Sequence, residues 1–226
     1  MKKRVLFILS VIISTITLSQ SHEAGVLLGG SNFIGDVGRT NYIYPNKFSG
    51  GIMYKYNINP RIALRGNYTY IALQGNDSNS DNSFRKLQNR SFSNNIHEFA
   101  AGAEFNFYDY NISDYRTTYT PYIFAQLAAF SHGTASKRTI DDEILFQNKF
   151  SYAIPFGIGV KGLLFDSLAI AFEIGARYTF TDEIDYSTPK INNLDFGGNG
   201  NDLYTFTGIS IVYTFGRPQC YSGLTN

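Results

Sequence analysis

Apolar and polar residues alternate along most of the chain after residue 22. A period of two places successive side chains on opposite faces of an extended strand. Eight segments have this pattern, at residues 23–31, 47–57, 60–72, 95–108, 119–131, 150–162, 167–180 and 202–215. Most are longer than the about 5–6 residues usual in soluble proteins and reach the about 9–11 residues of a tilted membrane strand. The pattern predicts an all-β fold, an eight-stranded antiparallel transmembrane β-barrel of the outer-membrane type.

Segment 167–180 separates the two faces most clearly. One face is apolar, with aromatic residues towards one end: Leu168, Ile170, Phe172, Ile174, Ala176, Tyr178 and Phe180. The other is small or charged: Ala169, Ala171, Glu173, Gly175, Arg177 and Thr179. A membrane barrel turns the first face to lipid and the second to its lumen. A soluble sandwich or lipocalin-like barrel would turn the apolar face inward. Parity alone does not separate these folds, but strand length and the inward charges favour the membrane barrel.

The connections between the segments alternate in length. Those at Asn57–Pro60, Asp109–Thr118 and Phe165–Asp166 are short, and the others are longer. Outer-membrane barrels have short periplasmic turns and longer outer loops. We therefore expect both termini in the periplasm. The predicted organisation is a signal peptide at 1–21, a transmembrane β-barrel at 22–215 and a periplasmic tail at 216–226.

The N-terminus resembles a secretory signal peptide. Lys2, Lys3 and Arg4 precede an apolar run from Val5 to Leu18, which is shorter than the roughly 20 residues of a membrane-spanning helix. Cleavage is expected after Ser21, with Ser19 as the alternative. Together with the strand pattern, this predicts a location in the outer membrane of a Gram-negative cell. The net charge of +1 gives no sign of a nucleic-acid surface.

Seven charged residues fall on the predicted lumen face. They are Lys55, Arg65, Lys161, Arg177, Glu98, Glu104 and Glu173. Eight strands enclose an interior just wide enough to be filled by side chains, so these charges are expected to pair, with Arg177 and Glu173 as plausible neighbours. The network either forms an ion path or, as we favour, seals the barrel.

Residues for catalysis or metal binding show no recognisable pattern. Cys220 is the only cysteine, and His22, His97 and His132 lack metal-ligand spacing. Asp77, Asn79 and Asp81 have the first spacings of a calcium loop, but Asn82 and Gln88 stand where Gly and Glu are needed. We interpret residues 76–95 as a solvated outer loop. No enzymatic activity and no cofactor are expected.

Several stretches resemble the PorG family of the type IX protein secretion system. They are GVLLGGSNFIGDVG (25–38), NPRIALRGNYTY (59–70), IHEFAAGAEFNF (96–107), TPYIFA (120–125), FEIGARYTFTDEIDY (172–186) and YTFGRPQCY (213–221). This resemblance implies an outer-membrane subunit of a machine that exports cargo proteins and, in gliding bacteria, supports motility. It also implies a link to the periplasmic ring of the lipoprotein PorK and its partner PorN. The family carries no catalytic residues.

The tail and the longest turn are the candidate contacts with such a ring. Arg217, Cys220 and Tyr221 follow the last strand, and a lone thiol in an oxidising compartment is suited to an intermolecular disulfide. A frayed terminus with an unimportant thiol is the alternative. Rival functions for the whole chain are a stand-alone barrel for adhesion or integrity, a lipid-modifying enzyme and a narrow channel.

Overall fold

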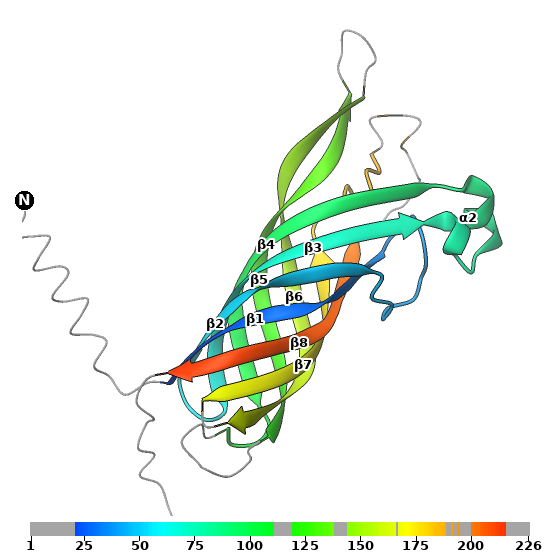
Figure 1. Ribbon diagram of the computed structural model, residues 1–226. Helices are drawn as coiled ribbons and strands as arrows, with labels where there is room; N and C mark the ends of the chain where they lie inside the picture. Colours follow the sequence, from blue (N-terminus) through cyan, green and yellow to red (C-terminus); the bar gives the residue numbers. More distant parts are fainter. Residues whose placement is uncertain are drawn as a thin grey trace, which may run out of the picture.

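The computed structural model (Figure 1) describes residues 21–110, 119–137, 144–165, 167–188, 191, 194 and 200–215. Its strands are β1 (Ser21–Ile34), β2 (Lys47–Asn57), β3 (Ile62–Asn76), β4 (Ser91–Asn106), β5 (Tyr119–Lys137), β6 (Ile144–Phe165), β7 (Leu168–Thr179) and β8 (Leu203–Phe215). Two short helical segments, η2 (Asp77–Asn79) and α2 (Ser83–Gln88), lie between β3 and β4. No helix among the described residues is long and apolar enough to cross a membrane. Apart from Ser21, the predicted signal peptide and tail lie outside the described residues.

The sheet closes on itself. Each strand pairs antiparallel with the next, and β1 also pairs with β8. This closing seam runs without a register shift from His22 opposite Phe215 to Ile34 opposite Leu203. Closure removes the free strand edges that an open sheet would expose. The predicted eight-stranded antiparallel barrel is confirmed.

The two ends of the barrel differ. The turn end carries the β2–β3, β4–β5 and β6–β7 connections together with Ser21 and Phe215. The loop end carries the other connections. There the β3–β4 pair continues to Asn76 opposite Ser91, and the β5–β6 pair continues to Lys137 opposite Ile144. These two hairpins project from the barrel in different directions (Figure 1).

The sequence-based boundaries end β5 too early and start β6 too late. We predicted a long loop between residues 131 and 150, but most of it is strand, and only residues 138–143 separate the two strands. The apolar alternation ends here because a strand that leaves the barrel wall no longer has one face on the apolar outer surface and one against a packed lumen. Backbone pairing continues without that pattern.

The segment 76–95 is also more structured than predicted. It contains η2, α2 and the first residues of β4. Asp77 is fully buried rather than solvated, accepts a hydrogen bond from the Gly38 amide at 2.8 Å and pairs with Arg90 at 3.0 Å. This carboxylate therefore anchors the β3–β4 connection to the β1–β2 loop instead of serving a calcium loop.

Pro155 does not create the bulge that its place in a strand suggests. The β5–β6 register is the same on both sides of it, with Ala125 opposite Phe156 and Ala128 opposite Ala153. Pairing is only interrupted between these positions, because proline lacks the backbone N–H. The irregularity of β6 lies instead between Leu163 and Phe165.

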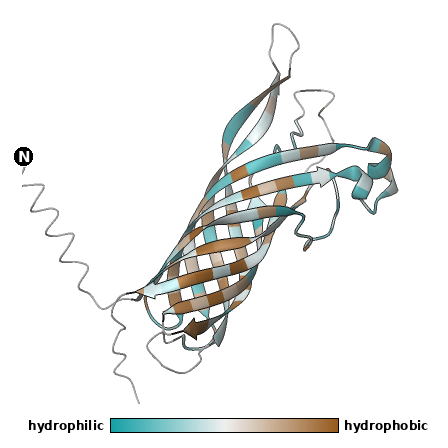
Figure 2. Cartoon of the chain, viewed as in Figure 1, coloured by the Kyte–Doolittle hydropathy of each residue, from teal (hydrophilic) through white to brown (hydrophobic). Residues whose placement is uncertain are grey.

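The wall has the inside-out distribution of apolar residues that parity predicts. In β7, Ala169 and Ala171 are buried, whereas Phe172 is 49% exposed on the outer face. Apolar residues gather along the barrel body in Figure 2, while the β3–β4 hairpin with α2 is mainly hydrophilic. Large apolar side chains therefore cover the outer face of the wall, while others, among them Ile71, Phe130 and Phe206, are buried inside with the charged residues.

A pair of glycines makes room for an aromatic ring inside. Gly157 of β6 lies opposite Gly175 of β7, and a Cβ added to either would come within 2.8 Å of the Phe124 ring. That ring lies under the Arg65 guanidinium at 4.2 Å. Small residues on two strands thus fix where a charged residue of a third strand sits.

Candidate functional site

Glu104 of β4 is the centre of the lumen charges. Its carboxylate contacts Lys161 Nζ at 2.6 Å, Lys55 Nζ at 2.7 Å and Arg65 at 3.5 Å. These cations come from β6, β2 and β3, and every one of the four side chains is at most 2% exposed. The contact joins strands from opposite sides of the closed barrel, so it fills the lumen.

Arg65 links this centre to a second carboxylate. Its guanidinium donates to Glu173 at 3.2 Å, and the Tyr122 hydroxyl donates to the same carboxylate at 3.0 Å. The Lys55 ammonium also lies 5.2 Å from the centre of the Tyr122 ring, and Lys161 lies 4.2 Å from that of Tyr110. Cation–π contacts of this kind are worth more where water is excluded.

A separate cluster lies nearer the loop end. Glu98 accepts a hydrogen bond from the Tyr204 hydroxyl at 2.7 Å and forms an ion pair with Arg177 at 3.7 Å. Arg177 also donates to the Gly175 carbonyl at 3.1 Å. The predicted neighbours Arg177 and Glu173 are not paired among the described contacts. Residues four apart along a strand lie about 13 Å from each other, so partners must come from facing strands.

All seven predicted lumen residues are thus buried, and an eighth belongs with them. Glu23 is 1% exposed and accepts a hydrogen bond from Asn57 at 2.7 Å. Parity applied to β1 would have found it, because Glu23 shares a face with the buried Leu27. Four cations (Lys55, Arg65, Lys161, Arg177) then meet four carboxylates (Glu23, Glu98, Glu104, Glu173), and these charges sum to zero.

The histidines do not assemble a catalytic site in the described part of the chain. His97 and His22 lie on the outer wall and contact the hydroxyls of Tyr68 at 2.8 Å and Tyr54 at 2.6 Å. His132 Nε2 lies 3.2 Å from Ser151 Oγ, but its Nδ1 faces the Gly133 carbonyl at 3.1 Å rather than a carboxylate. Both His132 and Ser151 are buried. No group of metal-binding residues is present among the described residues.

Carboxyl groups gather in the connection between β7 and β8. Asp202 accepts a hydrogen bond from the Ile184 amide, and Asp185 accepts one from the Ser187 amide, both at 2.9 Å. Burial, reinforced by the neighbouring Asp185, raises the pKa of Asp202 to about 9. Burial raises the pKa of Asp185 to about 7. Sequence reasoning missed this cluster, because its residues follow no strand parity.

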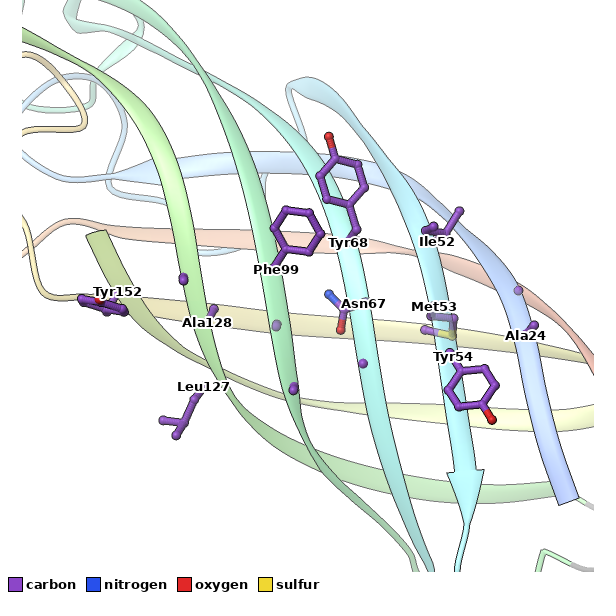
Figure 3. A pocket seen from close by; sticks show the side chains of 15 residues that line it. Ala24, Ile52, Met53, Tyr54, Asn67, Tyr68, Phe99, Leu127, Ala128 and Tyr152 are labelled. Atoms are coloured by element: carbon purple, nitrogen blue, oxygen red, sulfur yellow. The ribbon is translucent and has the colours of Figure 1, made fainter. Parts of the chain in front are cut away.

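A shallow groove of about 1020 Å³ lies on the outer wall, across β1 to β6. Its lining includes the exposed Ile52, Phe99, Leu127 and Tyr152 and the half-buried Tyr68, whose side chains Figure 3 labels. Ala101 and Gly66 pair across β4 and β3 beneath these larger groups. A surface of this composition is suited to hydrocarbon chains.

The predicted contact residues Arg217, Cys220 and Tyr221, and residues 111–118 of the turn at 109–118, lie outside the described residues.

Comparison with solved structures finds outer-membrane barrels at low identity. The N-terminal β-barrel domain of Pseudomonas aeruginosa OprF is 10% identical, with 87% of this chain and 98% of that chain covered and a TM-score of 0.46. A major outer membrane protein from Thermus thermophilus is 11% identical, with 87% and 100% covered and a TM-score of 0.48. Ail of Yersinia pestis, in complex with the heparin analogue sucrose octasulfate, is 11% identical, with 88% and 100% covered and a TM-score of 0.45. These likenesses are too distant to carry an argument about activity.

No curated protein sequence matches the chain significantly. A family model described as "Domain of unknown function (DUF6089)" matches residues 2–223. The chain belongs to this DUF6089 family.

Proposed function

We propose that the protein is an integral outer-membrane barrel that serves as a subunit of the type IX protein secretion machinery. The observation that carries the membrane part is the outer wall. Residues such as Phe99, Leu127, Tyr152 and Ile158 are each more than 60% exposed there, while buried ion pairs share the interior with a cluster of buried apolar side chains. A soluble protein rarely exposes an apolar surface of this extent. In a membrane barrel, lipid tails cover such an apolar surface.

The proposed orientation places the turn end in the periplasm. Short turns face the periplasm in outer-membrane barrels, and long loops face outward. Ser21 and Phe215 belong to the turn end, so both termini would be periplasmic. The tail with Arg217, Cys220 and Tyr221 would then begin on the side where the ring of PorK and PorN lies.

The barrel acts in this proposal as an anchor and not as a channel. The eight lumen charges are at most 3% exposed, and their contacts span the interior. An ion path would need charges that water reaches. No enzymatic step is proposed either, since the Ser151 hydroxyl beside His132 is buried.

The secretion part rests on the resemblance to the PorG family over nearly the whole mature chain. Affinity purification of the protein from its own membranes tests it, with PorK and PorN expected to co-purify. Deletion of its gene is expected to stop the secretion of cargo and, in a gliding bacterium, movement. A variant ending at Phe215 that still inserts but no longer retains the ring would assign the contact to the tail. Absence of both ring proteins and unchanged secretion would favour a stand-alone barrel.

A test of the disulfide uses Cys220→Ser. Wild-type protein is expected to run as a larger adduct on a non-reducing gel, and the variant is expected to lose this adduct. An unchanged adduct pattern would remove the disulfide and leave non-covalent contacts through Arg217 and Tyr221. Conductance in planar bilayers above that of empty bilayers would instead favour the channel.

A further inference from the structure

The sheet opens between β4 and β5 at the loop end. Their pairing stops at His97 opposite Ser131. Beyond this point β4 stays with β3 and β5 stays with β6, so the two hairpins diverge, as Figure 1 shows. A cleft of about 310 Å³ occupies the opening. This volume lies at the lower end of the range of small-ligand sites.

The lining of the cleft is polar but uncharged. It includes four side-chain amides, those of Asn94, Asn95, Gln147 and Asn148. Phe146 and Tyr186 add two aromatic rings, whose centres lie 5.3 Å apart in an edge-to-face arrangement. Among the described residues that line it, none carries a charge.

The floor of the cleft is held in place. The Asn94 amide donates to the Gly133 carbonyl at 2.8 Å and accepts from the Gly133 amide at 3.0 Å, so it bridges the strands where the backbone ladder has ended. Tyr186 has a positive φ of 67° and donates from its hydroxyl to the Ser93 carbonyl at 3.3 Å. Residues other than glycine adopt this left-handed backbone conformation at a cost in free energy. Contacts around Tyr186 must therefore hold its ring in this position.

The groups above the floor remain available. The side chains of Asn95, Gln147 and Asn148 have no hydrogen-bond partner among the described residues, and Phe146 is 70% exposed. Each free amide offers both donors and an acceptor. An exposed aromatic ring offers a flat apolar face beside them.

This chemistry selects the class of ligand. A phosphate or carboxylate ligand would need cationic partners, and the described residues that line the cleft include none. An added peptide strand would need the free backbone groups of the edges. At the level of Asn94, the amide and carbonyl of Gly133 already bond the Asn94 side chain, and the Ser93 carbonyl already accepts from Tyr186. A sugar has hydroxyls for amides and an apolar C–H face for an aromatic ring. We propose that the cleft binds neutral saccharide units.

The position of the cleft suggests two sources of such sugars. His97 and Ser131, where the strands part, adjoin the outward-facing Tyr70 and Phe150. Aromatic side chains gather at membrane interfaces in barrels. If the loop end faces outward, as the proposed function has it, the cleft lies beyond this interface, at the level of the sugar chains that extend from membrane glycolipids. The neutral sugars can therefore belong to a membrane glycolipid or to a free glycan.

The test measures binding to the whole mature barrel in phosphatidylcholine nanodiscs by surface plasmon resonance. The probes are smooth lipopolysaccharide of the source bacterium, its rough form without O-chain, and the free O-polysaccharide. Smooth lipopolysaccharide is expected to bind and the rough form is not. Binding of the free polysaccharide as well would assign recognition to the sugar alone, and its failure would assign the ligand to the glycolipid. Binding is expected to change little between low and high salt, since no charges are paired.

Two variants remove the recognising groups, and one serves as a matched control. Phe146→Ala and Asn148→Ala are each expected to weaken binding about tenfold, equivalent to about 1.4 kcal/mol. Phe150→Ala removes a ring that is 79% exposed, against 70% for Phe146, from the same face of β6 outside the cleft and is expected to leave binding unchanged. Folding of each variant is checked by its heat-modifiable migration on gels.

The proposal is overturned if the wild-type barrel binds neither smooth lipopolysaccharide nor the free polysaccharide. Equal binding of rough lipopolysaccharide, strong salt dependence, or an unchanged affinity of Phe146→Ala would overturn it too. Failure of the proposed function is a separate result, because it is read from insertion into membranes and from co-purification of the ring, which Asn148→Ala is expected to leave intact.

Discussion

Replacing Glu104 by glutamine is the most direct test of the lumen network. The substitution keeps the size of the side chain and removes one negative charge. It leaves Lys55, Lys161 and Arg65, which contact the carboxylate at 2.7, 2.6 and 3.5 Å, without their shared partner. All three cations are buried, so water cannot replace the lost charge.

The size of the effect follows from this burial. Removing one partner of a buried ion pair costs about 3–5 kcal/mol, because the remaining charge is left uncompensated. Here one substitution leaves the ammonium groups of Lys55 and Lys161 without this carboxylate, whereas Arg65 keeps its ion pair with Glu173. We therefore expect Glu104→Gln to lower the free energy of unfolding by about 3–5 kcal/mol. Cavity formation adds little, since the amide has the shape of the carboxylate.

The assay is urea unfolding of the barrel in phospholipid vesicles, followed by the circular dichroism of its strands. Asp109→Asn is the matched control. It breaks the Arg61–Asp109 pair, which has a 2.6 Å contact but side chains 52% and 67% exposed, and exposed pairs contribute at most about 1 kcal/mol. Adding Lys161→Met to Glu104→Gln should recover part of the loss by removing an unpaired cation. A Glu104→Gln barrel as stable as the Asp109→Asn barrel would refute the argument that the lumen charges neutralise one another.

Three further predictions address the wall, the interior space and the loop end. Ile158→Arg, at a position 62% exposed on the wall, should cost about 2–4 kcal/mol in vesicles, whereas Leu87→Arg on α2, 85% exposed, should cost little; equal costs in the same urea titration would argue against a lipid-facing wall. Gly175→Val should cost about 1–3 kcal/mol by overpacking, because its Cβ would lie 2.8 Å from Phe124, and thermal unfolding in detergent measures it. The pKa of Asp202 is raised from 3.8 to about 9 in the folded state, so its carboxyl stays protonated to a higher pH there than in the unfolded chain. The free energy of unfolding should therefore fall as pH rises between about 4 and 9. Asp202→Asn should flatten that profile, and a profile unchanged by the substitution would contradict the assignment.

The period-two alternation of apolar and polar residues is what made the strands predictable from sequence. In β7 the side of each side chain follows from its position alone, because a strand turns successive residues to opposite faces. The buried position of Glu173 and the outward position of Phe172 were therefore accessible without a structure. Pairing across the lumen was not. The partner of Arg177 depends on the stagger of all the strands, and it proved to be Glu98 on β4 rather than Glu173 on its own strand.

The loop end was the least predictable part for the same reason. Beyond Ser131 and before Phe150 the strands leave the layer where one face meets lipid, and their sequence loses the alternation that marks them. The amide cleft there depends on where the β4–β5 pairing ends, at His97 opposite Ser131. The Asn94 side chain donates a hydrogen bond to the Gly133 carbonyl of β5 across the gap. No sequence motif predicts such a contact.

The lumen network also restricts where function can reside. Charges that neutralise one another inside a filled barrel serve to hold the strands in one arrangement, and they expose no reactive or transport group to water. In the anchor model, function therefore depends on the surfaces at the two ends and on the wall. The Glu104→Gln substitution should accordingly reduce cargo secretion only as far as it reduces the amount of folded barrel in the membrane. Normal levels of inserted Glu104→Gln barrel combined with lost secretion would mean that the lumen itself takes part, and the anchor model would have to be replaced.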